Sequence, residues 1–399
     1  MSAIYLYDDA RARDFQPFAL TRSIAELRAG ALLVRERWSR ALGVPVAGVL
    51  TSAHLAGFVE RGSAPVLERP VMEAGSWLVN ARFAPAISRA PNAEVLEADG
   101  RVVAVRLASG TNGDVGDGAL DLAQLATQRS RAAAEGWWMD DVWDYIRHLV
   151  VMLQADIPLL AAGMRAGAPK GAIVIGTQPI FVEPGAVVEP NVCFDTTEGP
   201  IYLRAGSRVQ AFTRLVGPLY VGEHSILTTD RISASSIGDT CKVHGELSNT
   251  IMLGHANKGH DGFVGHSMIG RWVNLGAGTI TSNLKNTYGP VHLWTPDGTR
   301  DTGMQFLGTL FGDHAKTGIG VRLTTGCVLG AGANVFGSVI PPKAVAPFSW
   351  GEAGSFEPYH LDKFLEAAER MMARRDVALE DGMRTQLQLA FERRWTVEQ

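Results

Sequence analysis

The sequence predicts an α/β domain, followed by a left-handed parallel β-helix and a C-terminal helix. Two observations carry this prediction. Short apolar runs alternate with helical patterns in the first 165 residues, as in α/β domains. From residue 170 onward, aliphatic residues recur every six positions, which is the hexapeptide repeat of a β-helix. We place the three parts at residues 1–165, 170–350 and 356–396.

In the first part, short apolar runs predict strands over residues 4–7, 46–50, 77–79 and 102–107. A helix is predicted where Ile24, Leu27, Ala31, Val34 and Trp38 share one helical face. A second apolar stripe with helical spacing runs from Val142 to Leu153. This alternation indicates a sheet covered by helices.

The β-helix is predicted from separate runs of the six-residue spacing. They are Val182, Val188 and Phe194; Leu203, Val209, Leu215, Val221 and Leu227; Ile269 and Leu275; and Thr317, Leu323, Leu329 and Val335. Neither the helical period nor simple strand alternation generates this spacing. We therefore expect aliphatic side chains to point inward and small residues to occupy the tight corners.

The C-terminal helix is predicted from an apolar stripe beyond Pro358, made of Leu361, Phe364, Leu365, Ala368, Met371 and Met372. We expect this stripe to pack on the protein itself or on a neighbouring subunit.

Composition and charge narrow the classes of partner. Hydrophobic residues make up 46% and charged residues 20% of the chain, as in soluble globular proteins. A formal net charge of −4 without a basic footprint argues against nucleic acid or an anionic membrane as partner. No run approaches the ~18 apolar residues of a membrane span. Three widely spaced cysteines and a polar N-terminus without a signal peptide predict a cytoplasmic protein.

Two polar motifs interrupt the hexads: residues 257–265 read NKGHDGFVG and residues 282–286 read SNLKN. With these motifs the second half of the chain resembles the acetyltransferase domain of the bifunctional N-acetylglucosamine-1-phosphate uridyltransferase/glucosamine-1-phosphate N-acetyltransferases, in particular a divergent branch. Residues 316–318 and 347–351 resemble the same branch. The resemblance implies acetylation of glucosamine 1-phosphate, or a similar amino sugar phosphate, by acetyl-CoA. It also implies a homotrimer around the axis of the β-helix.

The resemblance makes His260 the general base. An amine must lose a proton before it attacks a thioester, and imidazole can accept that proton at neutral pH. Without the surrounding motif, His260 is interpreted as a surface histidine on a β-helix loop.

The resemblance also implies substrate contacts. Asn283 corresponds to an asparagine that contacts the acceptor and the acyl donor, and Asn274 is expected to point toward the sugar. Candidates for holding the sugar 1-phosphate as point charges are Lys285 and Lys258, then Arg231 and Lys242. A solvated surface role is the alternative for Arg231 and Lys242.

For the pantetheine arm of CoA, the resemblance implies that Ala277, Gly278 and Ala331 expose backbone amides. Small residues are expected at β-helix corners for packing reasons alone, so the two roles coincide.

A different class stays open as an alternative. The β-helix also hosts zinc carbonic anhydrases of the γ class, which use three histidines from adjacent subunits. His224, His255 and His260 supply three imidazoles that leave an open position for water. The long acyltransferase motif favours acetyl transfer.

The start of the chain contains Arg13 and the stretches LTR (20–22) and AELRAG (25–30). It resembles the divergent sugar-nucleotidyltransferase domain that precedes the β-helix in the same branch. Ordinary members cradle the triphosphate in a glycine-rich loop, which residues 8–11 (DDAR) replace here. The resemblance implies that Arg13, Arg22 and Arg28 supply positive charge to the phosphates. Helix-surface arginines are the alternative.

Nucleotidyltransferases of this kind bind Mg²⁺ through aspartates, because a hard cation prefers carboxylate oxygens. In residues 78–82 (LVNAR) the expected aspartate is Asn80, which we assign to the nucleotide site. In residues 137–144 (WWMDDVWD) Asp140, or its neighbour Asp141, is the predicted metal ligand.

The sequence thus predicts a bifunctional transferase. The β-helix acetylates the amino sugar phosphate, and the N-terminal domain joins the product to a nucleoside triphosphate such as UTP, with release of pyrophosphate. Two alternatives remain for the parts: a β-helix that only assembles subunits, and an N-terminal domain that only positions substrate.

Overall fold

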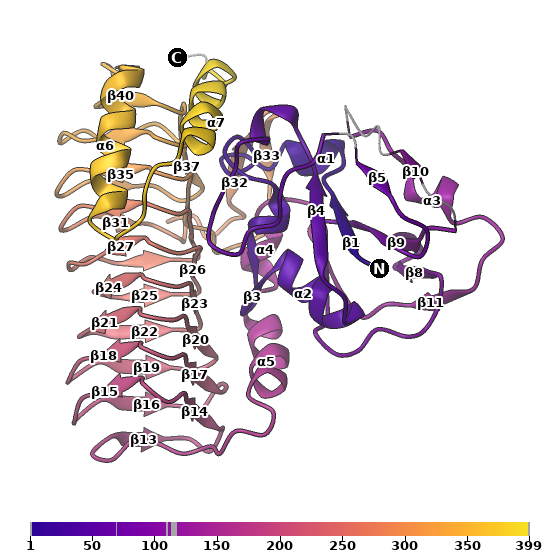
Figure 1. The fold of residues 1–399 in the computed structure, drawn as a ribbon. Coiled ribbons are helices and arrows are strands. Elements are labelled where there is room, and N and C mark those ends of the chain that lie inside the picture. Colours follow the sequence, from indigo (N-terminus) through magenta and orange to yellow (C-terminus); the bar gives the residue numbers. More distant parts are fainter. Residues whose placement is uncertain (1, 69, 109–110, 113–117, 398–399) are drawn as a thin grey trace. The chain divides into compact units, whose positions relative to one another are not determined.

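The computed structural model describes residues 2–68, 70–108, 111–112 and 118–397 (Figure 1). The chain divides into two compact units. The first contains residues 1–144 and 380–393, and the second contains residues 145–379 and 394–399. None of the helices in the described ranges has the length and hydropathy that crossing a membrane requires.

The first unit is built on a six-stranded mixed sheet with the order β11-β8-β9-β6-β1-β4. Its strands are β1 (Ile4–Tyr7), β4 (Val46–Leu50), β6 (Trp77–Asn80), β8 (Val95–Ala98), β9 (Arg101–Arg106) and β11 (Arg131–Ala133). β1 runs parallel to both β4 and β6, whereas β9 runs antiparallel to β6. The four strands predicted from apolar runs are confirmed. Because β4, β1 and β6 are parallel, their carboxyl ends lie at one edge of the sheet.

The helix predicted from the stripe between Ile24 and Trp38 is only partly present. α2 (Val34–Leu42) begins at Val34, and the preceding residues form the antiparallel pair β2 (Arg28–Ala29) and β3 (Leu32–Leu33). Gly30 turns this pair with φ +61°, a backbone conformation that interrupts a helix. The prediction was wrong for the residues before Val34, because the buried residues of the hairpin and those of α2 together follow the spacing of a single helix.

The remaining elements of the first unit have two to four residues each, except the longer helix α7. They are α1 (Ala10–Arg13), η1 (Ile24–Glu26), η2 (Ala53–Leu55), β5 (Val71–Met72), β7 (Phe83–Pro85), β10 (Thr111–Asn112), α3 (Leu122–Leu125), β12 (Gly136–Trp138) and α7 (Asp381–Glu392). The stripe predicted from Val142 to Leu153 forms two helices, α4 (Asp144–Arg147) and α5 (Leu149–Leu160), which separate at His148.

The second unit is a parallel β-helix of the predicted left-handed class, with three faces of stacked strands (Figure 1). The first face contains β13 (Ile173–Ile175), β16 (Cys193–Asp195), β19 (Arg214–Val216), β22 (Arg231–Ser233), β25 (Leu247–Ser248) and β28 (Val264–Gly265), continued by β31 (Ile280–Thr281) and β36 (Arg322–Leu323). The second contains β14 (Ile180–Val182), β17 (Ile201–Leu203), β20 (Leu219–Val221), β23 (Ser236–Ile237), β26 (Ile251–Met252), β29 (Met268–Ile269), β34 (Thr309–Phe311), β37 (Cys327–Leu329) and β39 (Ala344–Val345). The third contains β15 (Val187–Val188), β18 (Arg208–Val209), β21 (Ile226–Thr228), β24 (Lys242–His244), β27 (Asn257–Lys258), β30 (Asn274–Leu275), β35 (Lys316–Thr317), β38 (Asn334–Val335), β40 (Ser349–Gly351) and the antiparallel β41 (Glu357–Pro358).

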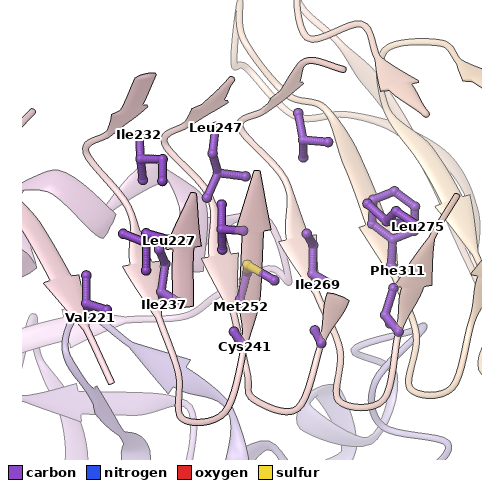
Figure 2. Packing of buried hydrophobic residues seen from close by; sticks show 14 of the residues in the cluster. Val221, Leu227, Ile232, Ile237, Cys241, Leu247, Met252, Ile269, Leu275 and Phe311 are labelled. Atoms are coloured by element: carbon purple, nitrogen blue, oxygen red, sulfur yellow. The ribbon is translucent and has the colours of Figure 1, made fainter. Parts of the chain in front are cut away.

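The core of the β-helix is a column of inward side chains, one from each strand of each coil. Figure 2 shows part of this column, in which Val221, Leu227, Ile232, Ile237 and Leu247 stack along the axis. Leu203, Leu215, Val221 and Leu227 are each 0% exposed, which confirms the six-residue spacing as the inward period. Burial of this apolar surface stabilises the stacked coils.

One arm leaves the coil between β31 and β34. It forms an antiparallel hairpin of β32 (His292–Thr295) and β33 (Gly298–Asp301), and the coil resumes where the Thr309 amide donates to Ser267 Oγ at 3.0 Å. The predicted C-terminal helix is α6 (Leu361–Ala373), which buries Phe364, Leu365, Ala368 and Met372. Phe364 contacts His314 and Phe348 of the β-helix at ring distances of 5.7 and 5.0 Å.

Candidate functional site

The corners of the β-helix define three edges. Each coil runs through the first, second and third faces in turn. The first edge joins the third face of one coil to the first face of the next coil. The second edge joins the first and second faces, and the third edge joins the second and third faces. His260 lies on the first edge, in the loop of residues 259–263 between β27 and β28, and its side chain is exposed.

The His260 loop is held against the next coil by backbone hydrogen bonds. The Gly278 amide donates to the Asp261 carbonyl at 3.3 Å, and the Thr281 amide donates to the Phe263 carbonyl at 2.9 Å. Gly262 has φ +115°, and a Cβ at this position would lie 2.4 Å from the Thr279 carbonyl oxygen. Only glycine lets the loop approach so closely.

Lys258, predicted to hold the sugar phosphate, points into the core instead. It occupies an inward position of the coil, is 2% exposed, and donates through Nζ to the carbonyls of His244 and His260 at 2.7 Å each. Burial lowers the pKa of Lys258 to about 8, although Asp261 and Asp230 act in the opposite direction. The ammonium group therefore fixes the backbone of the His260 loop from inside.

Ala277 and Gly278 lie at the first edge, one coil beyond His260 and half-buried. A Cβ at Gly276 would lie 2.5 Å from the Gly318 carbonyl oxygen, so bare backbones stack at this corner. Ala331 lies on the third edge, between β37 and β38, and is 1% exposed. The structure therefore groups Ala277 and Gly278 with His260 and places Ala331 at a different corner of the same chain.

The two predicted asparagines lie on different parts of the coil. Asn274 is on the third face, where its Oδ1 accepts from Asn257 Nδ2 at 2.7 Å. Asn283 is on the second edge, where its Nδ2 lies 2.8 Å from His266 Nδ1. Lys285, two residues on, donates to the Pro290 carbonyl at 3.0 Å.

Two further cations and the zinc alternative were also predicted. Arg231 lies near Glu246, 3.5 Å apart, on the first face, and Lys242 is exposed on the third. His224 and His255 lie on the third edge, whereas His260 lies on the first. Among the residues that the structure describes, no group of three or more His, Cys, Asp or Glu is placed to hold a metal ion.

In the first unit, polar side chains gather at the carboxyl ends of β4, β1 and β6. Asp8 and Asp9 follow β1, Thr51 follows β4, and Asn80 ends β6. Thr51 Oγ1 donates to Asp8 Oδ2 at 2.6 Å, and burial raises the pKa of Asp8 to about 6. Asp9 also caps α1 by accepting from the Ala12 amide at 2.9 Å.

Arg82 connects Asp9 to a second carboxylate, that of Asp140, which follows β12. Its Nε and Nη2 donate to Asp9 at 2.9 and 2.7 Å, and its Nη1 donates to Asp140 Oδ1 at 3.0 Å. Arg101 binds the same Asp140 through two nitrogens, at 2.6 and 3.2 Å, and stacks 3.8 Å from the centre of the Trp138 ring. Burial would raise the pKa of Asp140, but the hydrogen bonds and charges of Arg101 and Arg82 outweigh it and lower the pKa.

The predicted metal ligand Asp140 and its neighbour Asp141 are both paired with arginines, and Asp141 pairs with Arg11 at 2.9 Å. Both oxygens of Asp9 and both oxygens of Asp140 accept hydrogen bonds from guanidinium groups. Asn80 donates to Asp9 at 3.0 Å, and its Oδ1 accepts from the Arg82 amide at 2.8 Å. Two guanidinium groups therefore already balance the charge of Asp140, the carboxylate predicted to bind Mg²⁺.

The three predicted arginines separate into two groups. Arg13 lies beside the carboxylate cluster and donates through Nε to the Asp8 carbonyl at 3.1 Å. Arg22 is 2% exposed and forms a two-nitrogen ion pair with Glu60 at 2.8 and 3.1 Å. Arg28 is 6% exposed and donates to the Ala31 carbonyl. Arg22 and Arg28 therefore stabilise the fold of the first unit.

Sequence reasoning missed Arg82, Arg101 and His266 as members of these clusters. Arg82 carried a usable signal, because it follows Asn80 directly after a strand that runs parallel to β1. Arg101 and His266 carried none, since their partners lie 39 and 17 residues away in the sequence.

Comparisons with known proteins agree with this architecture. Residues 4–165 match the family model described as sugar nucleotidyl transferase. A protein of Methanococcus vannielii named bifunctional protein GlmU is 30% identical over 131 residues, which cover 33% of this chain and 30% of that protein. The protein of the same name from Bartonella quintana is 29% identical over 168 residues, covering 40% and 32%. A bifunctional sugar-1-phosphate nucleotidylyltransferase/acetyltransferase of Sulfurisphaera tokodaii is 31% identical over 96 residues, covering 24% of each chain. This chain thus spans at most about a third of the length of these relatives.

Proposed function

We propose that this chain, whose residues 4–165 match the sugar nucleotidyl transferase family model, is a bifunctional sugar-phosphate transferase. The β-helix acetylates glucosamine 1-phosphate, or a similar amino sugar phosphate, from acetyl-CoA. The N-terminal unit joins the product to a nucleoside triphosphate such as UTP and releases pyrophosphate. The name of the Sulfurisphaera tokodaii relative, a bifunctional sugar-1-phosphate nucleotidylyltransferase/acetyltransferase, supports both activities.

The observation that carries the acetyl transfer is the placement of His260. Its imidazole is exposed on a loop that two backbone hydrogen bonds and the Lys258 ammonium hold in place. The loop lies against the corner of Gly276–Gly278, where small residues leave backbone within reach of a ligand. A rigid loop that presents an exposed base beside bare backbone is suited to general base catalysis.

In the proposed step, the amine nitrogen of the sugar attacks the thioester carbonyl carbon of acetyl-CoA. A carbon–nitrogen bond forms and the carbon–sulfur bond breaks, so that the CoA thiolate leaves. His260 accepts the proton that the amine loses, and this proton then passes to the thiolate. Asn274 and Asn283 are the proposed contacts to the sugar.

We further propose that a neighbouring copy of the chain completes this site in a trimer. Phe212 and Ile319 lie on the same edge as His260 and are 74% and 80% exposed. They lie five coils apart along this edge, one on each side of His260. A neighbouring copy seated there would cover them and enclose the His260 loop.

For nucleotidyl transfer, we propose that Arg13, Arg82 and Arg101 provide the positive charge that a triphosphate needs. They lie at the carboxyl edge of the parallel strands, where ligands of such sheets bind. In this proposal phosphoryl oxygens replace the carboxylates of Asp9 and Asp140 as partners of Arg82 and Arg101, because guanidinium groups bind phosphoryl oxygens through two nitrogens at once.

The test compares two histidine variants in the full chain. With acetyl-CoA and glucosamine 1-phosphate, His260→Ala is expected to abolish release of the CoA thiol. In a separate assay that supplies the acetylated sugar phosphate and UTP, the same variant should release pyrophosphate at the wild-type rate. His292→Ala, which removes an exposed histidine of β32, is the matched control and should retain both activities.

If the wild-type protein releases no CoA thiol with any amino sugar phosphate, the acetyl transfer is refuted and the β-helix assembles subunits only. If His260→Ala retains the wild-type rate, His260 is not the general base.

A further inference from the structure

The side chain of Asn283 lies in a cradle on the second edge. His266 Nδ1 is 2.8 Å from Asn283 Nδ2, and the His266 ring stacks on Phe306 with ring centres 5.3 Å apart and planes 25° apart. A Cβ at Gly265 would lie 2.8 Å from Asn283 Nδ2. The absent side chain at Gly265 therefore gives the carboxamide its space.

The backbones on both sides of this cradle are fixed. The His266 amide donates to the Ser248 carbonyl at 2.9 Å, and the His266 carbonyl accepts from the Gly308 amide at 2.8 Å. The Asn283 carbonyl accepts from the Leu307 amide at 2.9 Å. His266 has φ +47°, which turns the chain at this edge and directs the ring along the coil toward Asn283.

The hydrogen bond sets the chemistry of both groups. An amide nitrogen only donates, so His266 Nδ1 must carry a lone pair and the proton of the neutral ring must be on Nε2. Burial lowers the pKa of His266 to about 4, so the ring is neutral at physiological pH. If the carboxamide turned over, its oxygen could accept from Nδ1 only if the neutral ring carried its proton on Nδ1 instead of Nε2, so the tautomer of His266 and the orientation of Asn283 are coupled. Asn283 Oδ1 is therefore directed away from His266.

The cradle adjoins the His260 loop. The Phe263 ring lies 2.4 Å from the position that a Gly265 Cβ would take, beside the same Asn283 nitrogen, and Phe263 belongs to the loop that carries His260. A group that contacts Asn283 is thus close to the side of the coil on which His260 is anchored.

We propose that His266 is a positioning residue, which locks the Asn283 carboxamide so that Oδ1 accepts a hydrogen bond from the N–H of the acceptor amine. The proposal rests on the proposed acetyl transfer. It assigns Asn283 to the amine of the acceptor, because a carbonyl or phosphate oxygen would meet the Oδ1 lone pairs. The substrate class is therefore a sugar phosphate that carries a free primary amine.

The experiment compares His266→Phe with His266→Asn in the full chain. Phenylalanine keeps the stacking on Phe306 but removes the acceptor. Asparagine adopts positive φ more readily than most residues and places an amide oxygen close to the position of Nδ1. We expect His266→Phe to raise KM for glucosamine 1-phosphate by about tenfold, as for the loss of one well-placed hydrogen bond, with KM for acetyl-CoA unchanged. His266→Asn should stay close to the wild-type value.

A double-mutant cycle with Asn283→Ala separates positioning from a structural role. His266→Phe should have no further effect on KM in the Asn283→Ala background, since the residue acts through Asn283. An equal loss in both backgrounds overturns the proposal.

A second measurement does not depend on activity. In ¹⁵N spectra at pH 7, His266 should be neutral with its proton on Nε2. A proton on Nδ1, or a charged ring, overturns the proposal whether or not the protein transfers acetyl groups. Absence of CoA release from wild type, with the expected ring state, refutes the proposed function and the substrate role of His266 but leaves the lock itself in place.

Discussion

Replacement of Gly262 by alanine should displace the His260 loop while leaving the coil intact. A Cβ at this position would lie 2.4 Å from the Thr279 carbonyl oxygen, whereas ordinary contact begins at 3.4 Å. The loop must therefore shift by about 1 Å, and a misplacement of that size costs about 100-fold in rate when it moves a group that acts on the substrate. We expect kcat for CoA release to fall by about 100-fold, and pyrophosphate release to stay unchanged.

Gly298 provides a matched control for the backbone strain. Gly262 has φ +115° and Gly298 has φ +108°, but a Cβ at Gly298 meets no atom within 4 Å. Gly298→Ala should therefore share the conformational cost without moving His260. Rates of CoA release of both variants measure the effect of moving the His260 loop. Their thermal unfolding curves measure the backbone cost of replacing a glycine with positive φ. If Gly262→Ala releases CoA as fast as Gly298→Ala, the position of this loop does not determine the rate.

Two further predictions concern Lys258 and Arg82. Burial lowers the pKa of Lys258 to about 8 from its ordinary 10.5, so between these pH values the unfolded chain holds a proton that the folded chain has released. The free energy of unfolding of the wild type should therefore rise with pH across this interval by up to about 3 kcal/mol relative to that of Lys258→Met. Urea unfolding at pH 8 and at pH 10.5 measures both values. If the free energies of the two proteins change equally with pH, the prediction is wrong. Arg82→Lys loses the two-nitrogen contact to Asp9 and should lower pyrophosphate release by about tenfold, with CoA release unchanged. Arg106→Lys, at the end of β9, is the control, and equal rates in the two variants would remove Arg82 from the nucleotide site.

The β-helix could be predicted from its sequence because most coils keep the six-residue spacing. Between Arg231 and Gly265 the coils persist without that spacing. Ile232 and Ile237 are five residues apart, and Val243 and Leu247 are four apart, yet all four side chains are buried. Shorter corners produce this change, and serine hydroxyls bond the backbone there, as Ser235 Oγ does to the Ser233 carbonyl at 2.6 Å. A period search detects spacing, and therefore misses coils whose corners differ in length.

The candidate sites were harder to predict than the fold. Lys258 occupies the inward position that in other coils holds Leu227, Val243 or Leu275. From the sequence alone, a lysine is expected on the surface. Only the structure shows the two backbone carbonyls that accept hydrogen bonds from its buried ammonium group. The resemblance assigns Arg22 to phosphate, and the sequence does not show its ion pair with Glu60, because Glu60 lies 38 residues away. His260 kept its assignment as a prediction because its loop lies between strands whose stacking follows from the repeat.

The arm between β31 and β34 has a consequence for how such a protein can vary. At its tip a Cβ on Gly298 would meet no atom within 4 Å, whereas its returning end supplies Phe306 to the His266 ring and the Leu307 amide to Asn283. Side chains can thus be added at Gly298 without a contact that would disturb the coil. The stem is under a different constraint, because any slippage there by one residue would dismantle the asparagine cradle while every rung of the β-helix stayed in register.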